Sequence, residues 1–295
     1  MRYILFVGHG SRDEAGNEEI RKFVHGLVHK KKYPHAEVCF LEFGTPDISK
    51  GIDACINGGA IEIIAVPIIL LPAGHSKMHI PQAIDAARLK YPHVKFYYGT
   101  PVGTDRQILE ILNHRIEEIP PEFVKPDETA VLLLGRGSSD ADANSTLSRI
   151  ARLFWESHKP GNKFYTVETA FMGVTQPLMQ EGLNRCRLLG AKRIIILPYF
   201  LFTGILMERM KKYTREYAVE YPDTKIHLAN YFGFHPLLEE IVSRRIEEAV
   251  SGEVQLNCDL CKYRMENAHD HSHGHSHDHH HGHDHDHHTH DHAHT

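Results

Sequence analysis

Cysteine is scarce in this sequence, with five residues, which is an odd number. A small and odd number of cysteines without a secretory context argues against a framework of disulfide bonds. Cys39, Cys55 and Cys186 lie in apolar strand-like or helix-like stretches. We therefore expect these three residues to be small members of the core.

A long apolar run is missing from the N-terminal region. The apolar stretch from Tyr3 to Val7 is interrupted by Gly8 and His9. It is too short for the core of a signal peptide or for a membrane span. We expect a cytoplasmic protein without a membrane partner.

A surplus of positive charge is missing as well. The formal net charge is -5, and residues 266–295 hold six carboxylates but no Lys or Arg. The rest of the chain therefore carries a formal charge of about +1 once those six negative charges are set aside. Proteins that bind nucleic acid usually present a clearly basic face, so we expect no DNA or RNA partner.

An internal repeat divides the sequence into two related halves. The segment from Val7 to Asp13 reappears 127 residues later, as Leu134 to Asp140. The pattern Phe-Leu-Glu at residues 40–42, with Pro46, reappears as Phe-Met-Gly at residues 171–173, with Pro177, at an offset of 131. The repeat predicts a duplicated domain, with about four residues gained before the second strand of the later copy.

Short β-rich runs alternate with longer amphipathic stretches in each half. The strands predicted in the first half are Tyr3–Val7, Ala36–Phe40, Ile61–Pro67 and Lys95–Tyr98, and the helices are Glu14–Lys31, Asp47–Asn57, Pro81–Lys90 and Asp105–Glu118. This alternation is typical of a parallel sheet covered on both faces. We predict an α/β fold of two duplicated domains, residues 1–120 and 127–252, joined by a proline-rich connector.

Residues 253–295 differ in composition from the two halves. Cys258 and Cys261 have the Cys-x-x-Cys spacing that suits zinc, a redox pair or part of an iron–sulfur cluster. Fifteen histidines follow, interleaved with Asp, Ser and Gly, whereas an engineered tag is usually a short uninterrupted run. The first of them are His269, His271, His273, His275 and His277. This composition predicts a tail that is disordered without metal and offers many weak metal sites.

Three potential metal ligands follow the predicted strands of the first half. His9 follows the first strand, Glu42 ends the second, and His75 lies beyond the third. Ligands of open parallel sheets bind outside the carboxyl ends of the strands, so these side chains are expected to converge. Two imidazoles and a carboxylate suit a late first-row divalent ion and leave coordination positions open for its transfer.

The second half provides an internal comparison for these three residues. The residues at the same places in the repeat are Arg136, Gly173 and Leu206, so all three ligand types are absent there. The Gly and Pro positions of the same loops are retained. Each ligand alone has an ordinary structural explanation, as part of an anion-binding turn, a helix cap or a surface loop. Their joint loss in one half favours a metal site in the other.

The loop motifs resemble those of the class II chelatases. They are Gly8-His9-Gly10-Ser11-Arg12, Glu42 followed by Pro46, and Pro72-Ala73-Gly74-His75. The sequence is similar to the long CbiX type of sirohydrochlorin cobaltochelatase and to the related ferrochelatase SirB. The resemblance covers both halves, and the long type also has a cysteine-containing segment and a His-rich C-terminus. It implies two similar α/β domains facing each other across a cleft, with His9, Glu42 and His75 as the active site.

The resemblance also implies the reaction. A lyase-type chelatase would insert Co(II) into sirohydrochlorin, a step of cobalamin biosynthesis and, more broadly, of porphyrin biosynthesis. Iron and nickel stay open as the metal, because nitrogen-rich sites favour copper, nickel and zinc over cobalt and so cannot name the ion. We assign His9 and His75 to metal delivery and proton removal, and Glu42 to orienting the metal or accepting a proton. His79 would share a helix face with His75 if a helix has already begun there.

Sirohydrochlorin carries eight carboxylates, so its site is expected to offer cations or N–H donors. The candidates in the two Gly-rich turns are Ser11, Arg12, Arg136 and Ser138. Arg136 stands where the first half has a ligand histidine, and a cation there would face the substrate. Arg12 is equally well explained as a solvated loop charge.

Long cobaltochelatases resemble this sequence further in carrying an iron–sulfur centre, which would lie at Cys258 and Cys261. Two cysteines cannot complete a four-cysteine site, so a cluster would need other ligands or a pair shared across a homodimer. We expect the histidine tail to collect divalent metal ions for the active site.

Two other functions compete with chelation. Phosphoryl transfer by His9 is one, although histidine phosphatases have an arginine where this chain has Gly8. A metal storage or chaperone protein is the other, and it leaves the duplicated domain unexplained.

Overall fold

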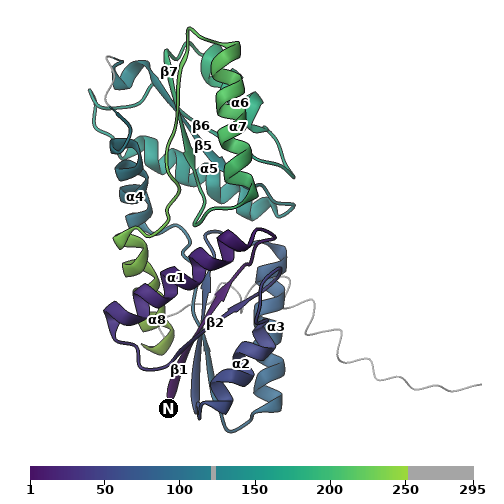
Figure 1. Cartoon of the computed structure of the whole chain (residues 1–295). Coiled ribbons are helices and arrows are strands. Elements are labelled where there is room, and N and C mark those ends of the chain that lie inside the picture. Colours follow the sequence, from purple (N-terminus) through teal and green to yellow (C-terminus); the bar gives the residue numbers. More distant parts are fainter. Residues whose placement is uncertain (121–123, 252–295) are drawn as a thin grey trace, which may run out of the picture. The chain divides into compact units, whose positions relative to one another are not determined.

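The computed structural model describes residues 1–120 and 124–251. The first half contains, in chain order, β1 (Arg2–Gly8), α1 (Glu14–Lys31), β2 (Ala36–Phe40), α2 (Ile48–Asn57), β3 (Glu62–Ile68), α3 (Gly74–Lys90), β4 (Lys95–Tyr98) and α4 (Arg106–Glu117). The second half contains β5 (Thr129–Gly135), α5 (Ala141–Glu156), β6 (Thr166–Phe171), α6 (Met179–Leu188), β7 (Arg193–Pro198), α7 (Ile205–Glu220), β8 (Lys225–Leu228) and α8 (Pro236–Ser251). Figure 1 shows both sets of elements.

Each half contains a parallel sheet with the same strand order. The orders are β2-β1-β3-β4 and β6-β5-β7-β8, and every described strand pair is parallel. The central strands β1 and β5 are almost entirely buried. Strands that are buried on both faces have nearly continuous apolar sequences, which is why they could be recognised in the sequence. The predicted α/β class and the duplication are confirmed.

Aspartates begin several of the helices. The Asp13 side chain accepts a hydrogen bond from the Ala15 amide at the start of α1, and Asp140 accepts one from the Asp142 amide at the start of α5. These two caps lie at the same place in the repeat. A carboxylate at this position satisfies an amide that has no partner within the helix.

Helix α3 begins earlier than the sequence predicted. We expected Pro81–Lys90, but the helix begins at Gly74 and contains Pro81 in its interior. The Ser76 hydroxyl stabilises this start by donating to the Ala73 carbonyl at 2.9 Å and accepting from the Ala73 amide at 3.0 Å. The prediction was wrong because it took the proline as the first residue of the helix. His75 consequently lies in the first turn of α3.

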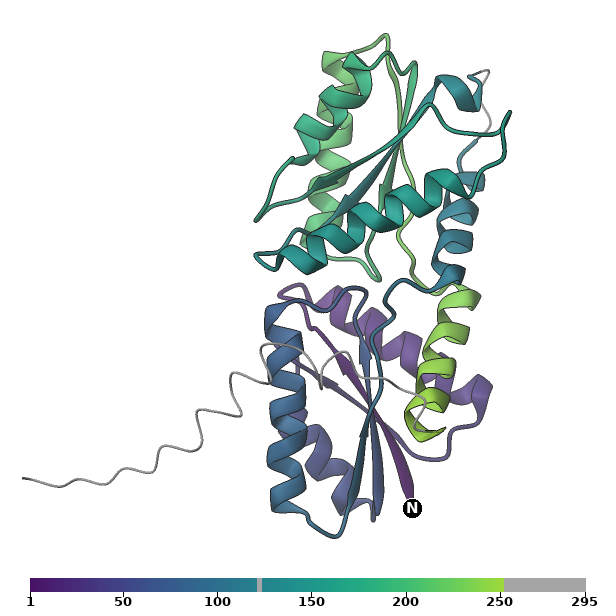
Figure 2. The ribbon, with the colours of Figure 1, turned by 180° about the vertical axis from the view of Figure 1, so that it is seen from behind.

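Helices cover both faces of each sheet. Leu5 and Val7 of β1 point to the face covered by α2 and α3, whereas Ile4 and Phe6 point to the face covered by α1 and α8. This alternation follows from the two-residue period of a strand. In the second half, α6 and α7 cover one face, and α5 and α4 cover the other. Figure 2 shows the same layers from behind.

The last helix of each half packs on the sheet of the other half. Helix α8 contacts β3 and β4, and helix α4 contacts β7 and α5. Arg245 of α8 donates hydrogen bonds to the carbonyl groups of Pro101 and Val102, and Arg115 of α4 donates one to the Phe232 carbonyl. Each sheet is therefore completed by a helix from the other half. The predicted domains, residues 1–120 and 127–252, follow the sequence repeat, and their limits stay a prediction.

The gain of residues in the second half lies between its first helix and its second strand. Residues 32–35 connect α1 to β2, whereas residues 157–165 connect α5 to β6. Trp155 of α5 is tied to this longer connection by a hydrogen bond from its indole nitrogen to the Phe164 carbonyl.

Cys39, Cys55 and Cys186 are buried free cysteines, as predicted. Burial raises the pKa of Cys55 and of Cys186 to about 12 and also raises the pKa of Cys39. These thiols stay protonated at neutral pH and act as small apolar side chains. Cys258, Cys261 and the histidine tail, with its predicted disorder, lie outside the described residues.

Within residues 1–120 and 124–251, every helix is too short or too polar to span a lipid bilayer.

Candidate active site

The segments that follow β1 and β2 run side by side beyond the carboxyl end of the first sheet. The Leu41 amide donates to the Gly8 carbonyl at 2.9 Å, and the Glu42 amide donates to the His9 carbonyl at 2.9 Å. His9 and Glu42 are both half-buried. The fold therefore brings these two predicted ligands into neighbouring loops.

Gly10 permits this close approach of the two loops. Its φ is +87°, and a Cβ atom there would lie 1.6 Å from the Glu42 carbonyl oxygen. In the second half, Gly137 has a φ of +88°, and a Cβ there would lie 1.9 Å from the Gly173 carbonyl oxygen. Both positions need glycine because of the left-handed backbone and the absence of space. The loop geometry has been kept where the ligands have been lost.

A buried asparagine fixes the loop that carries His9. The Asn17 side chain accepts from the Ser11 amide at 2.8 Å and donates to the Ser11 carbonyl at 3.0 Å and to the Phe43 carbonyl at 3.1 Å. The Ser11 hydroxyl accepts from the Asp13 amide at 3.0 Å. Asn17 thus links the loop after β1 to the loop after β2.

The second half repeats this arrangement with Ser138, Asp140 and Asn144. The Asn144 side chain accepts from the Ser138 amide at 3.0 Å, and the Ser138 hydroxyl accepts from the Asp140 amide at 3.0 Å. Sequence reasoning missed both asparagines. The available signal was their identical spacing from the Gly-rich turn in the two copies of the repeat.

The His9 ring has polar partners at both nitrogens. Its Nδ1 lies 3.3 Å from the Gly10 carbonyl oxygen, and its Nε2 lies 3.3 Å from Nη1 of Arg136. A guanidinium group can only donate, so Nε2 accepts and the ring hydrogen belongs on Nδ1, facing the carbonyl. In this tautomer the Nε2 lone pair is the one that can bind a metal ion.

His75, the third predicted ligand, lies at the start of α3. The structure places its backbone in the first turn of α3, and its side chain lies outside the described part of the chain. His79 follows one turn later on the same helix and is exposed. Among the described side chains, no group of three or more His, Cys, Asp or Glu residues is positioned to hold a metal ion. The convergence of His9, Glu42 and His75 stays a prediction.

Lys77 forms an ion pair near the start of α3 that sequence reasoning missed. Its Nζ lies 2.8 Å from Oδ2 of Asp140 and 3.3 Å from Oδ2 of Asp142. Burial by itself lowers the pKa of Lys77, but hydrogen bonds and attraction from the two aspartates outweigh it and raise the pKa. Lys77 is therefore charged. The available signal was its position two residues after His75.

The two arginines expected to bind substrate carboxylates are both exposed, and the structure gives them different partners. The Arg12 guanidinium lies over the Phe43 ring, 4.8 Å from its centroid, whereas Arg136 faces His9. Phe43 has a φ of +51°, and Val174 has a φ of +68° at the same place in the repeat. Both side chains are exposed although their backbone conformation is unfavourable for residues with a Cβ.

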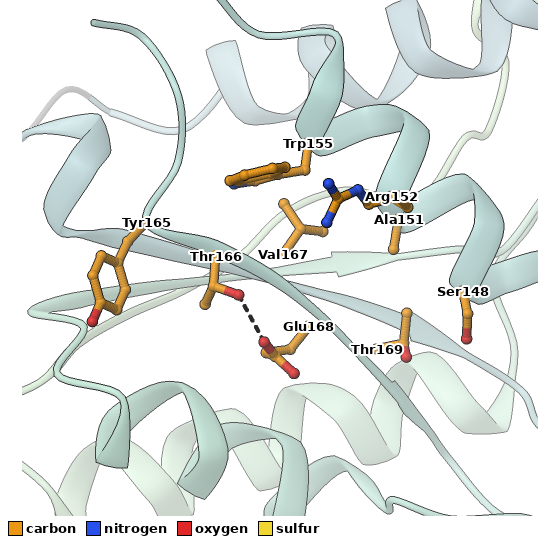
Figure 3. A pocket seen from close by; sticks show the side chains of 9 residues that line it. All are labelled: Ser148, Ala151, Arg152, Trp155, Tyr165, Thr166, Val167, Glu168 and Thr169. Carbon is orange, nitrogen blue, oxygen red and sulfur yellow. Dashed lines mark hydrogen bonds between the residues drawn. The ribbon is translucent and has the colours of Figure 1, made fainter. Parts of the chain in front are cut away.

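A cavity of about 340 Å³ lies elsewhere, between α5 and the first four residues of β6. Figure 3 shows Trp155, Arg152 and Tyr165 around it, with the Thr166 hydroxyl donating to the Glu168 carboxylate. The cavity adjoins the amino end of an edge strand, whereas ligands of parallel sheets bind at the carboxyl ends. It is therefore not the candidate active site.

Comparison with known proteins adds to this geometry. The CbiX family model matches residues 3–119 and 130–249. A sirohydrochlorin cobaltochelatase of Priestia megaterium is 50% identical over 267 residues, which cover 90% of this chain and 85% of that protein. A sirohydrochlorin ferrochelatase of the same organism is 37% identical over 253 residues, which cover 86% of this chain and 92% of that protein.

Solved structures agree with the sequence comparison. The structure of SirB from Bacillus subtilis with Fe3+ superimposes with a TM-score of 0.73 at 33% identity, covering 86% of this chain and 98% of that one. SirB from Bacillus subtilis subspecies spizizenii in complex with cobalt gives a TM-score of 0.71 at 32% identity, covering 86% and 97%. With the family match in both halves and the loop geometry described above, the chain belongs to the CbiX family.

Proposed function

We propose that this chain is a lyase-type metal chelatase that inserts Co(II) into sirohydrochlorin. The observation that supports the proposal is the backbone hydrogen bond that joins His9 and Glu42 beyond the strand ends, with His9 Nε2 facing Arg136 of the other half. The half that holds these residues also matches the CbiX family model. The relative that is 50% identical is itself named a sirohydrochlorin cobaltochelatase.

The proposed chemistry exchanges two protons for one metal ion. Two pyrrole N–H protons leave sirohydrochlorin as Co(II) binds its four ring nitrogens, so the site needs weak metal ligands and proton acceptors. Neutral His9 offers a lone pair at Nε2, and we assign His75 the same two tasks of metal delivery and proton removal. We assign Glu42 to orienting the ion or accepting the second proton. Arg136 must turn away from His9 Nε2 before that atom binds metal.

Cobalt is proposed over iron because the cobaltochelatase relative shares more of the sequence than the ferrochelatase relative does. The test is the absorbance of sirohydrochlorin mixed with the protein and Co(II), Fe(II) or Ni(II) in the absence of oxygen. Fastest conversion with Co(II) supports the proposal, and faster conversion with Fe(II) replaces it with ferrochelation for sirohaem. No conversion with any of the three ions contradicts chelation altogether.

Substrate binding is proposed to use Ser11, Arg12, Arg136 and Ser138. The two serine hydroxyls already accept backbone hydrogen bonds within their turns, and each keeps its own hydrogen to donate to a substrate carboxylate. Once displaced from His9, Arg136 has a planar guanidinium suited to binding a carboxylate.

The C-terminal proposals concern residues outside the described part of the chain. We propose that the histidine tail collects metal for the catalytic half, and that the reaction takes place in the cytoplasm. Removing residues 266–295 should leave the rate unchanged at saturating Co(II) and lower it when a metal buffer keeps Co(II) scarce. Equal rates at every Co(II) concentration would assign the tail to metal storage.

Two further proposals are an iron–sulfur cluster at Cys258 and Cys261 and a homodimer. Analysis for iron and acid-labile sulfide tests the cluster, and sedimentation tests the homodimer.

A further inference from the structure

The loop between β5 and α5, residues 136–140, is the counterpart in the second half of the loop that carries His9. It has lost the metal ligand, yet it contacts the first half at two points. Arg136 Nη1 lies 3.3 Å from His9 Nε2, and Asp140 Oδ2 lies 2.8 Å from Lys77 Nζ. One contact reaches a proposed ligand directly, and the other reaches the helix turn that holds another.

Asp140 is held rigidly by its surroundings. It is 7% exposed, its Oδ1 accepts from the Asp142 amide at 3.0 Å, and its own amide donates to the Ser138 hydroxyl at 3.0 Å. One carboxylate oxygen therefore caps α5, and the other faces the lysine. A buried carboxylate needs a partner of opposite charge, because an unpaired charge removed from water strongly destabilises the fold.

Lys77 transmits this constraint to the start of α3. Its side chain is 18% exposed, so the ion pair is largely shielded from water and is stronger than a surface pair. Lys77 lies two residues after His75, in the turn closed by the bonds between Ser76 and Ala73. Holding the lysine therefore restricts the backbone on which His75 lies.

We propose that Asp140 and Lys77 are positioning residues of the metal site, through which the second half sets the place of His75 relative to His9. This inference rests on the proposed function. Under this inference, the Gly-rich loop of the second half has a function although it carries no metal ligand. The loop of the second half then orients ligands that the first half supplies, and neither half forms the site alone.

The test uses substitutions that separate the ion pair from the helix cap. Asp140→Asn removes the charge but keeps a side chain that caps helices well. Lys77→Met removes the charge at similar length, and Lys77→Arg restores it. The control is Glu208→Gln, at the same place in the repeat as Lys77, because Glu208 and its partner Lys211 form an exposed surface pair.

The rate of Co(II) insertion is measured over a range of buffered Co(II) at saturating sirohydrochlorin, and then over a range of sirohydrochlorin at saturating Co(II). We expect Lys77→Met and Asp140→Asn to raise the KM for Co(II) by about 10- to 100-fold, the usual loss when residues that orient metal ligands are changed. The KM for sirohydrochlorin should stay unchanged. Lys77→Arg should recover most of the loss, the double variant should be no worse than either single variant, and Glu208→Gln should behave as the wild type.

The outcomes separate this inference from the proposed function. An unchanged KM for Co(II) in Lys77→Met, with a lower free energy of unfolding, would show that the pair only stabilises the fold and would overturn the inference. A loss in Lys77→Arg as large as in Lys77→Met would overturn it too, because the positive charge would then not matter. Absence of turnover in the wild-type protein with every metal would instead refute the proposed function.

Discussion

The two halves share their loop backbones but differ in the side chains that could do chemistry. Gly10 and Gly137 have the same left-handed conformation, and the same bonds between serine and asparagine close the following turn in each half. His9, Glu42 and His75 have no ligand counterparts in the second half. The difference teaches that the turn is maintained by sterics and hydrogen bonds, independently of whether it carries a metal ligand.

Helices α4 and α8, which each pack on the sheet of the other half, show a second difference between the halves. Arg115 and Arg245 lie at the same place in the repeat, and each donates to a backbone carbonyl group, of Phe232 and of Val102 respectively. Arg245 also lies 3.1 Å from the Asp105 carboxylate, where the second half has His235. Besides the shared carbonyl contact, α8 is therefore held to the first half by a half-buried ion pair that α4 does not make with the second half at the matching place.

The largest expected effect concerns the ligand histidines. We expect His9→Ala or His75→Ala to lower kcat/KM for Co(II) insertion by about 10²- to 10⁴-fold, the range for losing a proton acceptor in the transition state. Leu206→Ala, at the place of His75 in the second half, should lower it less than tenfold. Circular dichroism should show intact folds for all three variants. Near-normal turnover in His75→Ala would mean that we have assigned catalysis to the wrong half.

The second largest expected effect concerns Arg245 of α8 and Arg115 of α4. Arg245→Met should lower the free energy of unfolding by about 2.5 kcal/mol, because it removes one of the two arginine partners of the Asp105 carboxylate, which is 10% exposed and keeps Arg244. Arg115→Met should cost about 1.5 kcal/mol, because the partner it loses outside its own helix is a carbonyl group. Urea denaturation measures both values. Equal losses would mean that the ion pair adds nothing to stability.

Substitutions of Gly10 and Gly137 should have similar effects on stability but different effects on activity. Gly10→Ala and Gly137→Ala should each lower the free energy of unfolding by at least about 2 kcal/mol, because both combine a positive φ with a backbone clash. Gly10→Ala should also lower kcat markedly, since it displaces the segments that hold His9 and Glu42, whereas Gly137→Ala should mainly raise the KM values, since its loop is proposed to bind substrate and to position His75. A similar loss of kcat in both variants, measured where both are folded, would contradict the division of roles.

The smallest expected effect concerns the cap of α8. His235 accepts from the Leu237 amide at 3.2 Å, whereas Asp105 caps α4 at the same place in the repeat. Burial, followed by the charges of Arg115 and His114, lowers the pKa of His235. The unfolded chain then binds more protons between this lowered pKa and about 6.5, so stability is complete above that range and falls as the pH drops through it.

Replacing the histidine with the cap of the other half should therefore reduce acid sensitivity. His235→Asp should decrease the slope of unfolding free energy against pH between about pH 5 and 7 by less than one proton. Urea titrations at several pH values measure the slope. His114→Gln, which removes the neighbouring ring 3.0 Å away between nitrogen atoms, should decrease the slope less than His235→Asp, because burial is the larger cause of the lowered pKa. A slope that is unchanged in His235→Asp would place the acid sensitivity elsewhere.

Much of each half was predictable because its signals are local. The bounds of α1, β2 and β4 match the sequence prediction, since their apolar periods and flanking Asp, Gly and Pro residues are contiguous in the chain. The start of α3 was not predictable in this way. Its stabilising hydroxyl, Ser76, follows Gly74 in the chain, and Pro81 is the stronger local signal for a helix start.

The sequence by itself determined the duplication, the parallel α/β class, the family and the candidate ligands, because repeats, strand periodicity and loop motifs are all short-range patterns. The tertiary structure alone decided which sheet each last helix covers, because an apolar helix face indicates that it is buried but not against what. It alone paired Lys77 with Asp140 and His9 with Arg136. These partners are separated by many residues, and their meeting depends on how the chain packs.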